Sequence, residues 1–267
     1  MPSPQPVTVI MLAAQRSGVV NPLAERAGVS HKCIVPICGR PLVEHVLDTI
    51  TALPAIKEIR ISLEAEAHNA VRAIADQFAD RGVPVSFVEN DLNIVESVLK
   101  AAGSDEGPFI ITTADNVLLT PEGFEQVRET LATADATISV TTREAVWAAH
   151  PQGQAGFYEF KDAGYANCNL YGIAGPQAFK AAEFFREGGQ FQANPKRLLR
   201  AVGPFNILLM KLKLVTLPQG VARLSRRMGV SIKPVIFADG SLAIDVDNER
   251  TYDCCETILK RRAAGEA

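Results

Sequence analysis

The sequence is poor in the residues that cross-link small proteins or ligate zinc. Its 267 residues include five cysteines, an odd number without a C-x-x-C pair, and four scattered histidines. These counts exclude a disulfide-rich framework and argue against a Cys/His zinc site. The apolar run at residues 7–14 is too short for a membrane span or a secretory signal. We therefore expect free thiols and a cytoplasmic protein.

The chain also lacks an excess of charge of one sign. Its net charge is -3 at pH 7, with 47% hydrophobic and 21% charged residues, which is ordinary for a globular protein. Nothing in this balance indicates a nucleic-acid partner. A chain of this length can form one α/β domain with insertions and bury a large core.

Short apolar runs alternate with helical patterns over the first half of the chain. Strand character is found at residues 7–14, 56–63, 83–88, 109–114 and 136–142, and helical periodicity at 41–50, 64–81, 95–102 and 121–131. The alternation predicts an α/β fold with a mostly parallel central sheet and helices on both faces. Ligands bind such sheets at the carboxyl ends of the strands. The loops after Ala14 and Ala114 should therefore face one crevice.

The second half of the chain is less regular. Strand character is found at residues 156–158, 170–173, 230–237 and 241–245, and helical character at 179–185 and 251–262. Between these runs we expect an inserted helical region at about 178–229. In the first half, residues 15–31 are expected to form a polar loop.

The first strand leads into a turn suited to binding an anion. The strand ends in small residues, a polar turn follows, and Lys32 precedes the next helix. Small side chains let backbone N–H groups approach a phosphate, and the lysine adds positive charge. The P-loop and G-x-G-x-x-G patterns are both absent from the sequence. The candidate phosphate-binding residues are Leu12, Ala13, Ala14, Gln15, Arg16, Ser17, Gly18 and Lys32.

Two blocks in this region resemble the N-terminal signature of the MobA-like NTP transferases. Residues 12–14 read LAA, and residues 32–42 read KCIVPICGRPL. The family signature is L-A-A-G-x-G-x-R followed by K-x-L-x-P-V-x-G-K-P-L. Gln15 and Ser17 stand where glycines are usual, and Val19 stands near the usual arginine, whose charge Arg16 or Arg26 would supply. The resemblance implies the nucleotide-diphospho-sugar transferase (GT-A-like) fold.

Three further stretches resemble landmarks of the same family. Ser97-Val98 is similar to a motif that contacts base and ribose in the cytidylyltransferase branch. Residues 112–120, TTADNVLLT, are similar to an element whose aspartate, here Asp115, binds magnesium. Residues 244–247, IDVD, precede the last helix, as a similar acidic motif does in the family. The family also places an acceptor-binding asparagine near YANCNLYGI, which makes Asn167 and Asn169 candidates.

The positions of the acidic residues in the sequence predict a metal site independently of the resemblance. Asp115 follows a buried strand and should lie at its carboxyl end. Asp245 and Asp247 are two residues apart, so an extended backbone would turn them to the same side. Mg²⁺ takes one or two carboxylates together with phosphate oxygens and water. We expect Asp115 to be one metal ligand and Asp245 or Asp247 the other, although turn formation or helix capping by the latter pair is an alternative.

The resemblance implies a Mg²⁺-dependent nucleotidyltransferase. Such an enzyme moves a nucleoside monophosphate from a nucleoside triphosphate to a phosphorylated small-molecule acceptor and releases pyrophosphate. Lys32 and Arg16 would be the catalytic cations, and Ser97-Val98 mildly favours CMP. One alternative is a GT-A-type glycosyltransferase, although its D-x-D motif reads Asp115-Asn116-Val117 here. Another is a catalytically inactive nucleotide-binding regulatory protein.

The resemblance also implies how one domain, residues 1–267, is divided. We expect a nucleotide-binding half at residues 7–142 and an acceptor-binding half at 143–250. The helical insertion at about 178–229 would belong to the second half, and residues 251–267 would form a C-terminal helix.

A basic segment at residues 196–233 stands apart from the rest of the chain. Residues 188–238 contain no Asp or Glu but nine Lys or Arg, with apolar residues interleaved. Three interpretations stay open: an inserted helical subdomain with solvated basic faces, a lid that binds an anionic acceptor or supports a homodimer, and peripheral attachment to anionic lipid.

Overall fold

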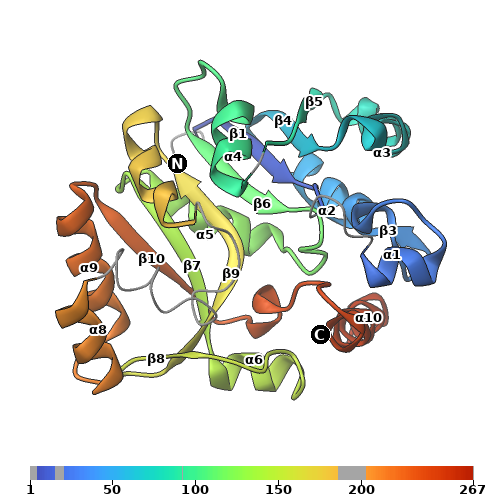
Figure 1. Ribbon diagram of the computed structural model, residues 1–267. Coiled ribbons are helices and arrows are strands. Elements are labelled where there is room, and N and C mark those ends of the chain that lie inside the picture. The colour runs from blue at the N-terminus through green and yellow to red at the C-terminus, as the bar shows by residue number, and fades with distance from the viewer. Residues whose placement is uncertain (1–4, 16–20, 92, 186–202, 267) are drawn as a thin grey trace.

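The fold is organised around one large sheet, seen in a computed structural model that describes residues 5–15, 21–91, 93–185 and 203–266. Eight strands form it in the order β10-β7-β9-β6-β1-β4-β5, with β8 paired to β9 outside this path. Figure 1 shows the sheet running from β10 to β5. The strands are β1 (Val7–Leu12), β4 (Ile56–Leu63), β5 (Val85–Glu89), β6 (Phe109–Thr113), β7 (Ala136–Thr142), β8 (Tyr158–Glu159), β9 (Gly164–Ile173) and β10 (Ile232–Phe237).

Most strand pairs are parallel, and β9 is the exception. It runs antiparallel to its neighbours β6 and β7 and to β8, whereas β1 is parallel to both β4 and β6. The carboxyl ends of β1, β4, β5 and β6 therefore meet at one edge of the sheet. This arrangement confirms the predicted mostly parallel sheet.

Helices cover both faces of the sheet, as predicted. Along β1, Val9 and Met11 belong to one buried cluster and Ile10 to another, because alternate side chains of a strand point to opposite faces. The first cluster includes side chains from α1 (Pro22–Ala27), α2 (Leu42–Thr51), α3 (His68–Ala75), α5 (Pro121–Leu131), α6 (Arg143–Ala149) and α10 (Glu249–Ala263). The second includes side chains from α4 (Ile94–Ala102), η4 (Pro176–Phe185) and α9 (Leu217–Met228).

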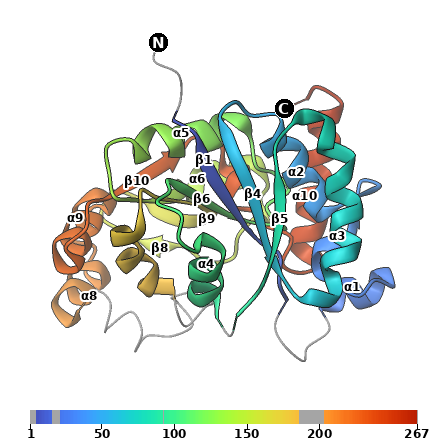
Figure 2. The ribbon, with the colours of Figure 1, turned by 90° about the horizontal axis from the view of Figure 1, so that it is seen from above.

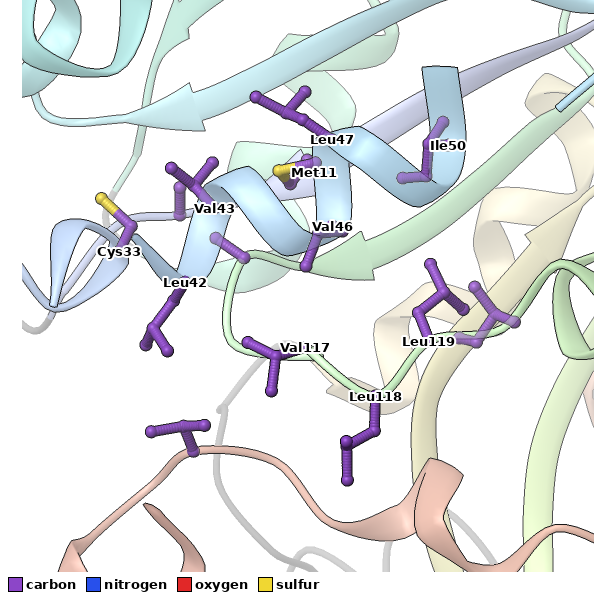
Figure 3. Close-up of a cluster of buried hydrophobic side chains, with 14 of the residues drawn as sticks. Met11, Cys33, Leu42, Val43, Val46, Leu47, Ile50, Val117, Leu118 and Leu119 are labelled. Atoms are coloured by element: carbon purple, nitrogen blue, oxygen red, sulfur yellow. The ribbon is translucent and has the colours of Figure 1, made fainter. Parts of the chain in front are cut away.

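Helix α2 connects the segment of Lys32 to the loop after β6 through apolar contacts. Figure 3 shows its side chains in one cluster with Met11 of β1, Cys33 and the loop residues Val117, Leu118 and Leu119. All of these side chains are almost completely buried. Lys32 directly precedes Cys33, and Asp115 directly follows Ala114, which is buried in the same cluster, so this packing brings their backbones together.

Two sequence expectations about local structure are wrong. Residues 15–31 are not a continuous loop, because α1 forms within them: Asn21 caps its first turn, Pro22 begins it, and Gly28 ends it in a left-handed conformation (φ 67°). Residues 241–245 are not a strand. They follow Asp239, whose side chain caps the short 3-10 helix η6 (Gly240–Ala243).

In the described residues between β9 and β10, the regular elements are all helical. They are η4, α8 (Pro204–Lys211) and α9. Residues 186–202, which include Lys196, Arg197 and Arg200, lie outside the described residues. In the described part of the chain, no helix combines the length and apolarity needed to cross a membrane.

We predict that Gly240 is required for the packing that leads into the acidic motif of residues 244–247. A methyl group there would overlap the backbone of Ala145 and Val146 in α6, which has no flexible side chain to give way. Gly240→Ala should therefore lower the free energy of unfolding by about 2 kcal/mol or more in urea titrations. The control is Gly220→Ala in α9, whose added methyl meets only the Phe160 ring at 3.0 Å. Equal stability of the two variants would contradict the prediction.

Candidate active site

Three segments that are distant in sequence meet at the carboxyl ends of β1 and β6. Ala114 N–H donates to the carbonyl of Leu12 (2.9 Å), which joins the ends of the two strands. Val246 N–H donates to the carbonyl of Asp115 (3.2 Å), which joins the acidic motif before α10 to the loop after β6. Backbone hydrogen bonds, not side chains alone, therefore hold Asp115 next to residues 245–247.

Lys32 is the cation at the centre of this arrangement. It begins the short 3-10 helix η1 (Lys32–Ile34), and its Nζ donates to Asp115 Oδ2 and to Asp247 Oδ1, the latter at 3.1 Å. Lys32 and Asp115 are mostly buried, whereas the Asp247 side chain is 59% exposed. Burial alone would lower the pKa of Lys32, but Asp115 and Asp247 outweigh it and raise the pKa above its ordinary value. The lysine is therefore held firmly in its charged form.

Asp245 is the buried member of the acidic motif. Asn169 Nδ2 donates to its Oδ2 at 2.8 Å. Burial first, and then repulsion from Asp115 and Asp247, raise the pKa of Asp245 above its ordinary value. The expectation that Asp245 and Asp247 lie on an extended backbone is wrong, because Asp247 N–H donates to the carbonyl of Asp245 (2.9 Å) in a tight turn. One carboxylate is consequently buried and the other open to solvent.

The carboxylates of this site fit a divalent cation. Among the described residues, Asp115 Oδ1 and Asp245 Oδ1 are buried without any hydrogen-bond donor, a costly state that a cation would relieve. Three carboxylates here face one lysine, so negative charge is in excess when all are ionised. No group of three or more His, Cys, Asp or Glu side chains among the described residues is arranged to hold a metal ion. Mg²⁺ does not require such a group, because substrate phosphates and water usually complete its shell.

The two candidate asparagines lie on one face of β9 with a tyrosine. Residues 167, 169 and 171 alternate along the strand and so share a face. Asn167 Nδ2 donates to the Tyr171 hydroxyl (2.5 Å), whose oxygen lies 3.5 Å from Asn169 Oδ1. Asn169 contacts Asp245 directly, whereas Asn167 reaches it only through this chain of contacts. Sequence reasoning missed Tyr171, although its period-two spacing from the asparagines was a usable signal.

The loop after β1 is only partly described. Arg16, Ser17 and Gly18 lie outside the described residues, and Ala14 is exposed at the end of the described strand segment. Gln15 N–H donates to Glu64 Oε1 at 2.8 Å. Glu64 Oε2 also lies 3.9 Å from His31 Nε2. Glu64 follows β4 directly, and the sequence analysis did not name it as a site residue. The signal was available, because an acidic residue at the carboxyl end of a strand is also what indicated Asp115.

Two other predicted residues have clear structural partners. The Ser97 hydroxyl is buried near the start of α4 and accepts from Asp91 N–H (2.9 Å), which holds the loop between β5 and α4. Arg26, the alternative to Arg16, pairs with Glu249 at 3.3 Å and so links α1 to α10.

The chain matches the profile of the MobA-like NTP transferase domain over residues 9–209. It is 27% identical over 147 residues to the bifunctional protein GlmU of Desulfotalea psychrophila and 30% identical over 118 residues to that of Geobacillus thermodenitrificans. These alignments cover 54% and 42% of this chain but only 40% and 24% of the relatives, so the chain matches less than half of each relative's length.

Solved structures are similar over nearly the whole chain. A hypothetical transferase from Thermus thermophilus superposes with a TM-score of 0.73 at 25% identity, covering 93% of this chain and 99% of the other. The 4-diphosphocytidyl-2C-methyl-D-erythritol synthase of Anaerococcus prevotii has a TM-score of 0.57 at 13% identity, with coverages of 96% and 99%. A CMP:2-keto-3-deoxy-manno-octonic acid synthetase complexed with CTP has a TM-score of 0.57 at 14% identity, with coverages of 98% and 99%. The last two likenesses concern the fold alone.

We predict that Lys32 is required for stability because it neutralises the carboxylates around it. Lys32→Met should lower the free energy of unfolding by about 2–3 kcal/mol, since it leaves Asp115 buried and unpaired. Lys57→Met is the matched control: Lys57 pairs with Asp105 at 2.9 Å but is half exposed, and such a pair contributes less than about 1 kcal/mol. Urea titrations compare the two variants. A loss at Lys32 no larger than that at Lys57 would refute the prediction.

Proposed function

Because the chain belongs to the MobA-like NTP transferase domain family, we propose that it is a Mg²⁺-dependent nucleotidyltransferase. It transfers a nucleoside monophosphate from a nucleoside triphosphate to a phosphorylated small-molecule acceptor and releases pyrophosphate. The observation that carries this proposal is the placement of Lys32 between Asp115 and Asp247, with Asp245 beside them, at the carboxyl ends of β1 and β6.

The main obstacle to this reaction is repulsion between two anionic substrates. An acceptor phosphate oxygen attacks the α-phosphorus, and the bond to the pyrophosphate leaving group breaks. A phosphate nucleophile is already deprotonated at neutral pH, so no general base is needed. Lys32, together with Arg16, neutralises and orients the triphosphate, and the backbone of residues 12–18 contacts its phosphates.

The metal-binding part of the proposal rests on the acidic residues. Asp115 with Asp245 or Asp247 would hold Mg²⁺, which when bound supplies further neutralisation of the phosphate charges. The buried carboxylate oxygens without donors support this assignment. Lys32 would then be able to exchange one carboxylate partner for a phosphate oxygen of the substrate.

Acceptor and base recognition are assigned to two different elements. Asn169, and Asn167 with it, would contact the acceptor from β9, and the direct bond of Asn169 to Asp245 supports this placement. Ser97 would contact base or ribose from α4, and the preference for cytidine rests on the Ser97-Val98 motif alone. Residues 7–142 then form the nucleotide-binding half and 143–250 the acceptor-binding half. A location in the cytoplasm and a homodimer stay predictions.

The residues after Asp115 favour this activity over glycosyl transfer. In a D-x-D motif, two carboxylates hold the metal of a nucleotide sugar. The position of the second carboxylate is here taken by Val117, which is apolar and buried in the core. Asn116 between them is also buried, and its Nδ2 lies 3.2 Å from Thr112 Oγ1 and 3.3 Å from the carbonyl of Asn169, which braces β6 against β9.

The test is pyrophosphate release from four nucleoside triphosphates against sugar 1-phosphates, polyol phosphates, phosphocholine and cofactor phosphates. Release that requires both Mg²⁺ and an acceptor is the expected result. Triphosphate binding without turnover under any acceptor would favour the inactive regulatory protein. Nucleoside diphosphate release from a nucleotide sugar would favour the glycosyltransferase.

Asp115→Asn should abolish turnover while leaving the fold intact. Loss of a metal-ligating charge should reduce pyrophosphate release by about 10²-fold or more. The matched control is Asp253→Asn on the exposed face of α10, which should retain the wild-type rate. Circular dichroism verifies that both variants are folded. Wild-type turnover in Asp115→Asn would refute the metal-site assignment.

A further inference from the structure

Three leucine side chains protrude from α8 and the turn that follows it. Leu208, Leu212 and Leu214 are 51%, 58% and 56% exposed. The other large apolar side chains exposed in the described part of the chain are spread over three separate elements: Ile94, Trp147 and Ile236. A local group of exposed leucines indicates a contact surface, because scattered single residues are normal but a patch is not.

The backbone holds these leucines outward. Leu212 N–H donates to the carbonyl of Leu208 (2.9 Å), so the two side chains lie one helical turn apart on the same face. Lys213 then adopts a left-handed conformation (φ 52°), and Leu214 N–H donates to the carbonyl of Leu209 (2.8 Å). The next residue, Val215, is buried. The exposure of Leu214 is therefore a property of an ordered turn.

Basic side chains accompany the leucines. Helix α9 buries Leu217 and Val221 in the second cluster and carries exposed Arg226 and Arg227 in its last turn. Lys213 lies between two of the leucines and is more than half exposed while pairing with Glu159 at 3.0 Å. The sequence contains no acidic residue from position 188 to 238. The segment thus combines apolar side chains with positive charge, and Glu159 of β8 contributes one carboxylate beside Lys213.

This surface lies away from the candidate active site. Both views place α8 and α9 side by side next to β10 at one end of the sheet (Figures 1 and 2), whereas the acidic residues lie at the carboxyl ends of β1 and β6, which β9 and β7 separate from β10.

We propose that Leu208, Leu212, Leu214, Lys213 and Arg226, called here the leucine surface, dock the protein on an anionic lipid membrane. The leucines enter the boundary between headgroups and acyl chains, and the cations face lipid phosphates. A second copy of the chain fits less well, because a two-fold contact would place this basic surface against itself. A nucleic acid would use the cations but not the leucines.

The test is co-sedimentation of the full chain with vesicles. We expect binding to vesicles that contain phosphatidylglycerol, little binding to pure phosphatidylcholine, and weaker binding when salt rises from about 0.05 M to about 0.5 M. The triple variant Leu208→Ser/Leu212→Ser/Leu214→Ser should lower the partition coefficient about tenfold or more. Arg226→Gln should lower it only on anionic vesicles. Ile94→Ser, which removes an exposed apolar side chain elsewhere, is the control and should bind as the wild type does.

Three outcomes would overturn the proposal. One is a wild-type protein that fails to sediment with anionic vesicles at low salt. Another is binding that the leucine substitutions leave unchanged in a variant whose melting temperature matches the wild type. In the third, light scattering shows that the wild type is a dimer and the triple variant a monomer, and the wild type does not bind vesicles. That result would assign the leucine surface to a contact between copies of the chain.

Discussion

The ammonium group of Lys32, held between two aspartates, is the interaction on which the site depends. Asp115 and Asp247 belong to segments 132 positions apart in the numbering, and Asp245 adds a third carboxylate in the same place. Like charges at close range repel strongly in a partly buried site. One lysine offsets part of this repulsion. A positively charged ligand would offset the rest.

Apolar packing and backbone hydrogen bonds keep this repulsive group of carboxylates together. The buried cluster of α2, Met11, Cys33 and residues 117–119 joins the segment that follows Lys32 to the loop that follows Asp115 (Figure 3). The bond from Val246 N–H to the carbonyl of Asp115 fixes the third segment. Because burial of this many apolar side chains contributes far more than one unfavourable contact costs, the fold can hold a site that is electrostatically unfavourable without its ligand.

The molecule keeps two kinds of surface apart along its sheet. At the carboxyl ends of the central strands β1 and β6, three carboxylates that suit a cation surround Lys32. Beside β10, α8 and α9 present leucines and positive charges that suit an anionic lipid surface (Figure 2). Sheet strands β1, β6, β9, β7 and β10 connect the two regions.

The sequence by itself determined the class of the fold and the segments of the site. Alternation of apolar runs with helical periodicity is a local property, so the parallel sheet and its two helical layers could be predicted from it. The block KCIVPICGRPL and the acidic motifs likewise indicated Lys32, Asp115 and residues 245–247 as candidate site residues, and the structure places these residues together. Local patterns were misleading where a capping side chain determines whether a short helix forms. This is the case at Asn21 before α1 and at Asp239 before η6.

Only the tertiary structure decided which side chains touch. Three features of the site depend on the folded chain and not on local sequence. They are the hydrogen bond from Gln15 N–H to Glu64, the contact between Asn169 and Asp245, and the tight turn between Asp245 and Asp247. Exposure of Leu212 beside buried Val215 likewise depends on how α8 and α9 pack. No local pattern encodes such contacts, because strand order, register and the path of each loop fix them only after the whole sheet has assembled.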